Sequence, residues 1–164
     1  MKNRTTFRFA TADDVPLILY FIRELAQYEA LLHEVIADEE QLHRTLFGER
    51  AYAEVVFALW DGKPVGFALF FHNYSTFLGK PGLYIEDLFI EPEHRGSGIG
   101  KALLSHIACL AKERDCGRVE WWVLDWNAPS IGFYKKIGAL PMDEWTVFRL
   151  TGESLDDMAA LAAY

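Results

Sequence analysis

A glycine-rich segment with basic ends is the strongest chemical signal in the sequence. It consists of Arg95, Gly96, Ser97, Gly98, Ile99, Gly100 and Lys101, and a helix-like apolar pattern follows it. The first N–H groups of a helix lack intrahelical partners and lie at the positive end of the helix dipole, so they bind anions. Glycines let a phosphate approach closely, and the two cations favour a pyrophosphate. A loop that needs glycine only in order to turn is the plainer alternative.

The spacing of this loop separates it from two common nucleotide-binding motifs. A Walker loop has four residues between its glycines and Ser or Thr after its lysine, whereas three intervene here and Ala102 follows. The loop also lacks the third glycine of the Rossmann pattern. That pattern is expected in the first strand–turn–helix unit of a chain, whereas this loop follows a hairpin in mid-chain. An Arg-x-x-Gly-x-Gly pattern at a strand-to-helix junction remains.

An adjacent acidic pair, Glu86 and Asp87, lies within a strand-like run whose other residues are largely apolar. Successive side chains of a strand point to opposite faces, so we expect one of the two carboxylates to face a cleft. A carboxylate in such surroundings needs a partner, and a bound cation would supply one. An exposed edge or a structural ion pair would also explain the pair.

Other reactive side chains show no pattern typical of a site. The two cysteines, Cys109 and Cys116, have neither disulfide nor zinc spacing, and we expect reduced thiols. Ser97 and Ser105 lack a nucleophile-elbow setting. We expect no metal site, because no metal-ligand spacing relates the five histidines, His33, His43, His72, His94 and His106.

Turn residues and apolar periodicity predict alternating elements that would position these groups. We expect strands at 6–10, 53–60, 64–74, 82–90, 118–124 and 145–150, and helices at 13–28, 38–47, 99–114 and 128–137 with a helical tail from 154. Asp13 is the expected cap of the first helix, and Asp38 with Gln41 has capping-box spacing at the second. Antiparallel hairpins followed by a strand–helix–strand crossover predict an α/β fold with a mixed sheet and helices on both faces.

Composition narrows the class of protein and its partners. The 164 residues, 51% of them hydrophobic, fit a single domain over 1–164. The net charge of −8 and the absence of a large basic block argue against nucleic acid. No stretch reaches membrane-spanning length and no apolar segment follows residues 1–6, so we expect a cytoplasmic protein that does not bind membranes.

The glycine loop resembles the pyrophosphate loop of the GCN5-related N-acetyltransferase (GNAT) superfamily, with Arg95, Gly98 and Gly100 at its defining positions. Three further segments, 22–29, 83–89 and 126–135, resemble the diamine acetyltransferase branch, which includes spermidine/spermine and thialysine acetyltransferases. The resemblance spans roughly residues 6–150 in the same order. It implies the GNAT fold, acetyl-CoA as acetyl donor and a homodimer.

The resemblance also implies roles for individual residues. Tyr134 matches the general acid towards the coenzyme sulfur, and Glu86 matches a residue that contacts the amine and works through water as its base. The strand beside the pantetheine arm matches Leu88, Phe89 and Ile90, with a bulge that exposes an N–H. The implied cofactor contacts are these three residues, the loop from Arg95 to Lys101, Asn127 and Ser130. The implied amine contacts are Tyr28, Glu29, Glu86, Asp87 and Glu144.

These roles together predict acetyl transfer to a primary amine by direct attack in a ternary complex. A free alkylamine has a pKa of about 10, so it needs a base or a water relay before it attacks. The predicted acceptors are a small diamine, a polyamine or a thialysine-like amino acid. Ala30, Leu31, Leu32 and His33 stand where spermidine/spermine enzymes are more acidic, which favours the smaller amines. A non-catalytic acetyl-CoA sensor and a protein lysine acetyltransferase are the alternatives.

Overall fold

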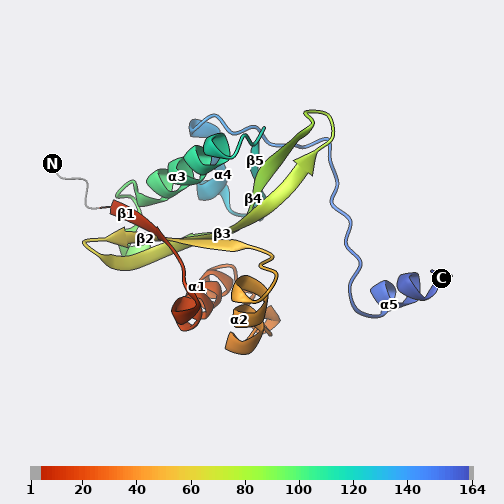
Figure 1. The fold of residues 1–164 in the computed structure, drawn as a ribbon. Coiled ribbons are helices and arrows are strands. Elements are labelled where there is room, and N and C mark those ends of the chain that lie inside the picture. Colours follow the sequence, from red (N-terminus) through yellow and green to blue (C-terminus); the bar gives the residue numbers. More distant parts are fainter. Residues whose placement is uncertain (1–4, 163–164) are drawn as a thin grey trace. The chain divides into compact units, whose positions relative to one another are not determined.

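A computed structural model describes residues 5–162 of the chain. The chain divides into two compact units, one ending at Trp122 and the other beginning at Val123. The predicted α/β class is confirmed by the first unit, which combines a mixed sheet with helices on both of its faces (Figure 1).

The sheet of the first unit contains five strands in sequence order among the described residues. They are β1 (Thr5–Phe9), β2 (Glu54–Trp60), β3 (Lys63–Ser75), β4 (Lys80–Ile90) and β5 (Val119–Trp121). The first four are antiparallel neighbours, and β5 is parallel to β4. The β2–β3 hairpin turns at Asp61 and Gly62, whose φ angles of 51° and 80° suit a tight two-residue turn.

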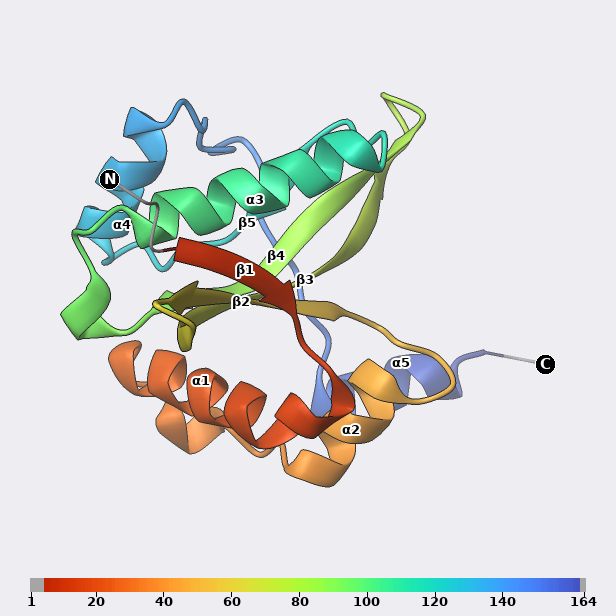
Figure 2. The same ribbon diagram turned by 60° about the vertical axis from the view of Figure 1, so that its left-hand side comes forward.

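Helices cover both faces of this sheet (Figure 2). The helices α1 (Val15–Tyr28) and α2 (Glu39–Phe47) lie on one face, and α3 (Ile99–Glu113) lies on the other. The core under α1 is aromatic, because the fully buried ring of Phe21 packs on Phe57, Phe67 and Phe89. Burial of these large apolar side chains fixes where α1 lies on the sheet.

Of the two helix caps predicted from the sequence, one is confirmed and one was wrong. The predicted capping box at α2 is confirmed, since the Asp38 side chain accepts a hydrogen bond from the Gln41 backbone N–H at 2.8 Å and the Gln41 side-chain oxygen accepts one from the Asp38 backbone N–H at 3.1 Å. The prediction of Asp13 as the cap of α1 was wrong. A 3-10 turn capped by Thr11 contains Asp13, and the cap of α1 is Asp14.

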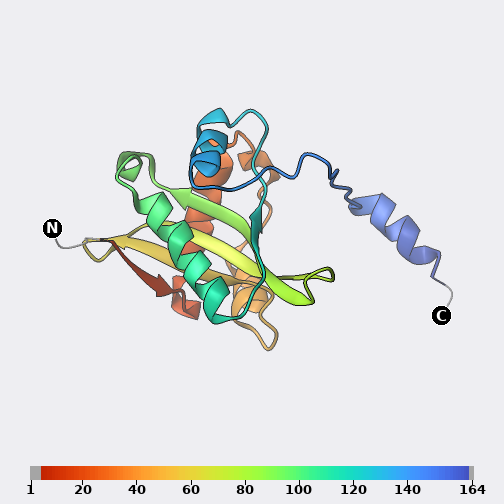
Figure 3. The same cartoon turned by 90° about the horizontal axis from the view of Figure 1, so that it is seen from above.

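The second unit contains two helices, α4 (Ala128–Lys136) and α5 (Gly152–Ala160). The chain between them is irregular (Figure 3), so the predicted strand at 145–150 was wrong. A strand needs a neighbour for its backbone groups, and the described residues of this unit supply none. The strand predicted at 118–124 is also shorter and covers only Val119–Trp121. No helix among residues 5–162 is long and apolar enough to cross a membrane.

Candidate active site

The glycine loop joins β4 to α3, as the sequence predicts. Gly96 and Gly98 have φ angles of 76° and 88°, a left-handed conformation that other residues rarely adopt. Gly98 caps α3 without a side-chain hydrogen bond, and a Cβ atom added at either glycine would meet no neighbour within 4 Å. The loop is therefore open at both glycines just before α3, and the exposed Lys101 stands on the first turn of that helix.

Arg95 opens this loop, and its side chain folds back towards the core. Its Nε donates a 2.8 Å hydrogen bond to the carbonyl oxygen of Ile90, the last residue of β4. Its guanidinium carbon lies 4.5 Å from the centre of the Tyr28 ring and 5.2 Å from that of Phe89. Arg95 thus contacts both the end of β4 and the end of α1. Its predicted contact with a pyrophosphate stays a prediction.

A bulge interrupts β4 at Glu86. Leu69 of β3 pairs with Asp87 and Phe70 pairs with Ile85, so Glu86 has no partner in this ladder. The GNAT resemblance implies a bulge within Leu88–Ile90, which was wrong in position, because these three residues pair regularly with β3 and the bulge comes two residues earlier. Bulges redirect side chains and are common beside active sites, so the strict alternation expected for Glu86 and Asp87 does not apply at this point.

Asp87 is the most strongly perturbed carboxyl group of the first unit. Burial, followed by the charges of Glu86 and Glu29, raises the pKa of Asp87 to about 7. Burial also raises the pKa of Glu29, which ends α1. Glu86 is exposed, whereas Asp87 and Glu29 are half-buried. Three carboxyl groups from two elements thus create a negative site that a cation would stabilise.

The end of β4 approaches β3 closely at a position that the sequence reasoning missed. A Cβ atom at Gly66 would lie 2.4 Å from the Phe89 carbonyl oxygen and 2.5 Å from a side-chain carbon of Ile90. Only glycine fits there, and a glycine inside a strand is the signal that could have indicated it. Phe89 and Ile90 are buried, and Leu88 is half-buried.

In the second unit, three predicted residues lie on or beside α4. The side-chain oxygen of Asn127 caps this helix by accepting a hydrogen bond from the Ser130 backbone at 3.3 Å. Tyr134 lies one turn later, half-buried, with its ring 5.4 Å from that of Phe133. Asn127 is 6% exposed and is the only buried residue among 123–162.

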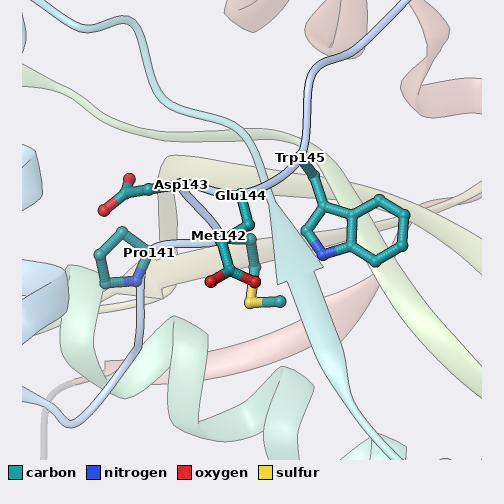
Figure 4. A pocket seen from close by; sticks show the side chains of 5 residues that line it. All are labelled: Pro141, Met142, Asp143, Glu144 and Trp145. Carbon is teal, nitrogen blue, oxygen red and sulfur yellow. The ribbon is translucent and has the colours of Figure 1, made fainter.

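Glu144, the remaining predicted amine contact, is exposed in the irregular chain after α4. It lines a small pocket together with its neighbours in the chain (Figure 4). The other lining residues are Pro141, Met142, Asp143 and Trp145. No helix or strand contains Glu144, which lies in a turn closed by a 3.1 Å hydrogen bond from the Trp145 backbone N–H to the Met142 carbonyl oxygen.

The predicted site residues therefore form two groups. Within the first unit, Tyr28, Glu29, Asp87 and Arg95 lie together at the ends of α1 and β4. Within the second, the first turns of α4 hold Asn127, Ser130 and Tyr134. That the two groups meet in one site stays a prediction. Among residues 5–162, no cluster of three metal-ligating side chains is present, and Cys109 and Cys116 are free thiols.

Comparison with known proteins decides the family. The acetyltransferase (GNAT) family model matches residues 19–139, a range that contains the donor loop, the acidic pair and Tyr134. The chain belongs to the GNAT acetyltransferase family. It is an enzyme that transfers acetyl groups to amines, as the sequence predicts.

Relatives of this acetyltransferase match nearly its whole length. The thialysine N-epsilon-acetyltransferase of Bos taurus is 37% identical over 165 residues, covering 93% of this chain and 95% of that protein. The L-ornithine N5-acetyltransferase NATA1 of Arabidopsis thaliana is 35% identical over 193 residues, covering 90% and 85%. The predicted diamine acetyltransferase branch is thereby confirmed.

A solved structure shows the same fold at lower sequence similarity. An aminoglycoside acetyltransferase from an uncultured soil metagenomic sample, in complex with sisomicin, superposes with a TM-score of 0.77 at 21% identity. The match covers 92% of this acetyltransferase and 98% of that chain. The fold predicted from the sequence is therefore confirmed as GNAT-like.

Proposed function

We propose that this acetyltransferase moves the acetyl group of acetyl-CoA to a primary amine of a small diamine, a polyamine or a thialysine-like amino acid. The observation that carries the proposal is the carboxyl group of Asp87, half-buried between the charges of Glu86 and Glu29 and close to the donor loop in the chain. An alkylammonium ion would relieve the repulsion among these groups. Relatives named for thialysine and ornithine acetylation support an amine of this size.

The residues present fit acetyl-CoA, whose bound form would supply an activated acetyl thioester. The glycine loop is open at Gly96 and Gly98, at the N-terminus of α3, where the helix N–H groups would attract an anion, and Lys101 adds a cation for a pyrophosphate. The end of β4, from Leu88 to Ile90, would line the pantetheine arm. In α4, Asn127 and Ser130 would contact the cofactor. Ser97, Ile99 and Gly100 complete the proposed set.

Glu86, Asp87 and Glu29 attract the amine in its protonated form, and Glu86 receives a proton from it through water. The amine must lose this proton before its nitrogen attacks in a ternary complex. The phenol of Tyr134 donates a proton to the departing sulfur, which is a poorer leaving group without one. Tyr28 and Glu144 complete the proposed amine contacts.

The proposal covers the whole chain as one catalytic domain, since the acid is on α4 and the carboxylates are on β4. A homodimer in the cytoplasm remains a prediction from the family resemblance and the sequence. A non-catalytic acetyl-CoA sensor and a protein lysine acetyltransferase are less favoured, because the two relatives above are named as acetyltransferases of small amines.

The test is thiol release from acetyl-CoA with a panel of diamines, polyamines, thialysine, ornithine, an aminoglycoside and a lysine peptide. We expect turnover with small amines, and Tyr134→Phe should lower kcat by about 100-fold or more, the usual contribution of a general acid. Tyr52→Phe is the control, because Tyr52 is exposed and its ring lies 5.0 Å from the guanidinium carbon of Arg50. Binding of acetyl-CoA without turnover of any amine would support the sensor instead. Unchanged kcat in Tyr134→Phe would remove the assigned acid.

A further inference from the structure

Two arginines hold the two ends of α1 in different ways. At the N-terminal end, Arg8 of β1 forms a paired contact with Asp14, with N–O distances of 2.7 and 2.8 Å, and its guanidinium lies 5.0 Å from the Phe57 ring centre. At the C-terminal end, Arg95 lies over Tyr28, the last residue of the helix. Arg8 belongs to the sheet, but Arg95 is the first residue of the donor loop.

Further contacts join α1 to the chain just before this loop. The Tyr20 hydroxyl donates to Glu91 at 3.2 Å, and Glu91 lies 4.0 Å from the His94 ring nitrogen. The Ser97 hydroxyl in turn donates to the His94 carbonyl oxygen. The loop that would hold the donor is therefore attached to α1 at two levels, one near the middle of the helix and one at its end.

We propose that Arg95 is a positioning residue that couples the donor loop to the acceptor site by holding the Tyr28 ring at the end of α1. One guanidinium contacts Tyr28 on one element and Phe89 on another, and its Nε fixes the carbonyl of Ile90. Glu29 follows Tyr28 directly, and Asp87 lies two residues before Phe89. A change of the loop that moves Arg95 would therefore also move Tyr28 and Phe89, which are close neighbours in the chain of these two acidic residues.

The coupling depends on the shape of arginine as well as on its charge. A planar guanidinium can stack on aromatic rings and still donate through Nε, whereas a lysine ammonium is a compact charge that cannot do both. Arg95→Lys therefore preserves the cation for the donor and removes the contact with Tyr28. That the end of α1 belongs to the amine-binding site rests on the proposed function. The coupling between the donor loop and α1 does not.

The first experiment measures the KM of the amine and the KM of acetyl-CoA separately. In Arg95→Lys, the KM of the best amine should rise about three- to tenfold at saturating acetyl-CoA, with kcat changed less than twofold, the size expected for a lost cation–π contact. Tyr28→Leu should raise it as well. Adding Arg95→Lys to Tyr28→Leu should raise this KM no further, because Tyr28→Leu already removes the ring that Arg95 holds. Additive effects, or a rise confined to the KM of acetyl-CoA, would overturn the proposal.

The second experiment needs no acceptor and uses coenzyme A alone as the probe. The backbone N–H groups of Glu29, Ala30 and Leu31 donate to carbonyl oxygens within the last turn of α1, so their hydrogen exchange reports how firmly this end is held. Saturating coenzyme A should slow exchange at 29–31 in the wild type and should leave it unchanged in Tyr28→Leu. Equal protection in both proteins would overturn the coupling.

Arg8→Lys is the matched control in both experiments. Arg8 also lies against a core ring and also holds α1, but Asp14, with which it pairs, is at the opposite end of the helix from the loop. We expect it to lower stability while the protection of 29–31 by coenzyme A and the amine KM stay as in the wild type. If the wild type acetylates no amine, the proposed function fails, and the exchange experiment still decides the coupling.

Discussion

Apolar, strand-like segments occur in both units of the chain, but only the first unit buries them. In the first unit, α1, α3 and strands β2 to β4 all contain fully buried apolar side chains. In the second, α4 has half-buried residues but neither α4 nor α5 contains a buried one, and the strand-like residues Trp145 and Phe148 are 71% and 92% exposed. An apolar alternating sequence thus becomes a strand only where a neighbouring strand is available.

The predicted site residues also differ in burial between the two units. The donor loop and the carboxyl groups belong to the buried unit, where packing fixes the backbone that carries them. The proposed acid, Tyr134, belongs to the unit without an apolar core of its own among residues 123–162. We therefore expect core mutations of the first unit to destroy the fold, and changes in the second to act mainly on catalysis.

Phe21→Ala should have the largest effect on stability. The Phe21 ring is fully buried and packs on three other rings, so its removal should cost about 3–5 kcal/mol through lost burial and a cavity. Urea unfolding followed by circular dichroism would measure the loss. A change under about 1 kcal/mol would show that the core can collapse around the gap and would weaken the contrast between the units.

Asp87→Asn should show a pH-dependent effect on stability. Burial raises the pKa of Asp87 to about 7, so between about pH 4 and pH 7 the folded state keeps a proton that the unfolded chain releases. This contribution is complete below pH 4 and is lost as the pH rises through 7. Asn cannot ionise, so the variant should be more stable than the wild type at pH 8, by up to about 4 kcal/mol.

The check on Asp87 is urea unfolding of both proteins between pH 4 and pH 8. The two stability curves should converge near pH 4, where Asp87 is protonated. Asp14 offers a contrast, because its hydrogen bonds with Arg8 lower its pKa to about 2, so Asp14→Asn should be less stable at pH 8. Parallel curves for Asp87→Asn and the wild type would show that Asp87 titrates normally.

Asp38→Ala tests a purely local feature of the first unit. It removes the capping box of α2 and should cost about 1 kcal/mol, whereas Asp38→Asn keeps the side-chain acceptor and should cost less. Thermal unfolding of the two variants in parallel measures the difference. Equal losses would show that the charge at the helix start matters more than the hydrogen bond.

Phe148→Ala should have the smallest effect, within about 0.5 kcal/mol, because the ring is almost fully exposed. Urea unfolding compares it directly with Phe21→Ala. A loss of 2 kcal/mol or more, on the order of a buried aromatic contact, would contradict the contrast. It would indicate that this segment packs in solution, and light scattering would then test whether a second copy provides the surface.

Local signals explain why most of the fold could be predicted. The hairpin at Asp61–Gly62, the box at Asp38 and Gln41 and the glycines of the donor loop each depend on neighbours in the chain, so their residues suffice to indicate them. The cap at Asp13 failed by one residue because a 3-10 turn extends the helix start. The strand at 145–150 failed because strand formation depends on a partner that local sequence does not specify.

The sequence by itself determined the family, the donor loop and the identity of the reactive side chains, since motif and spacing are properties of the chain. Only the tertiary structure decided that Glu86 forms a bulge, that Asp87 lies in a setting that raises its pKa, and that Arg95 turns back onto Tyr28. Those three features join residues from different elements. Their energies come from burial and long-range contact, which depend on how the elements pack rather than on the order of residues along them.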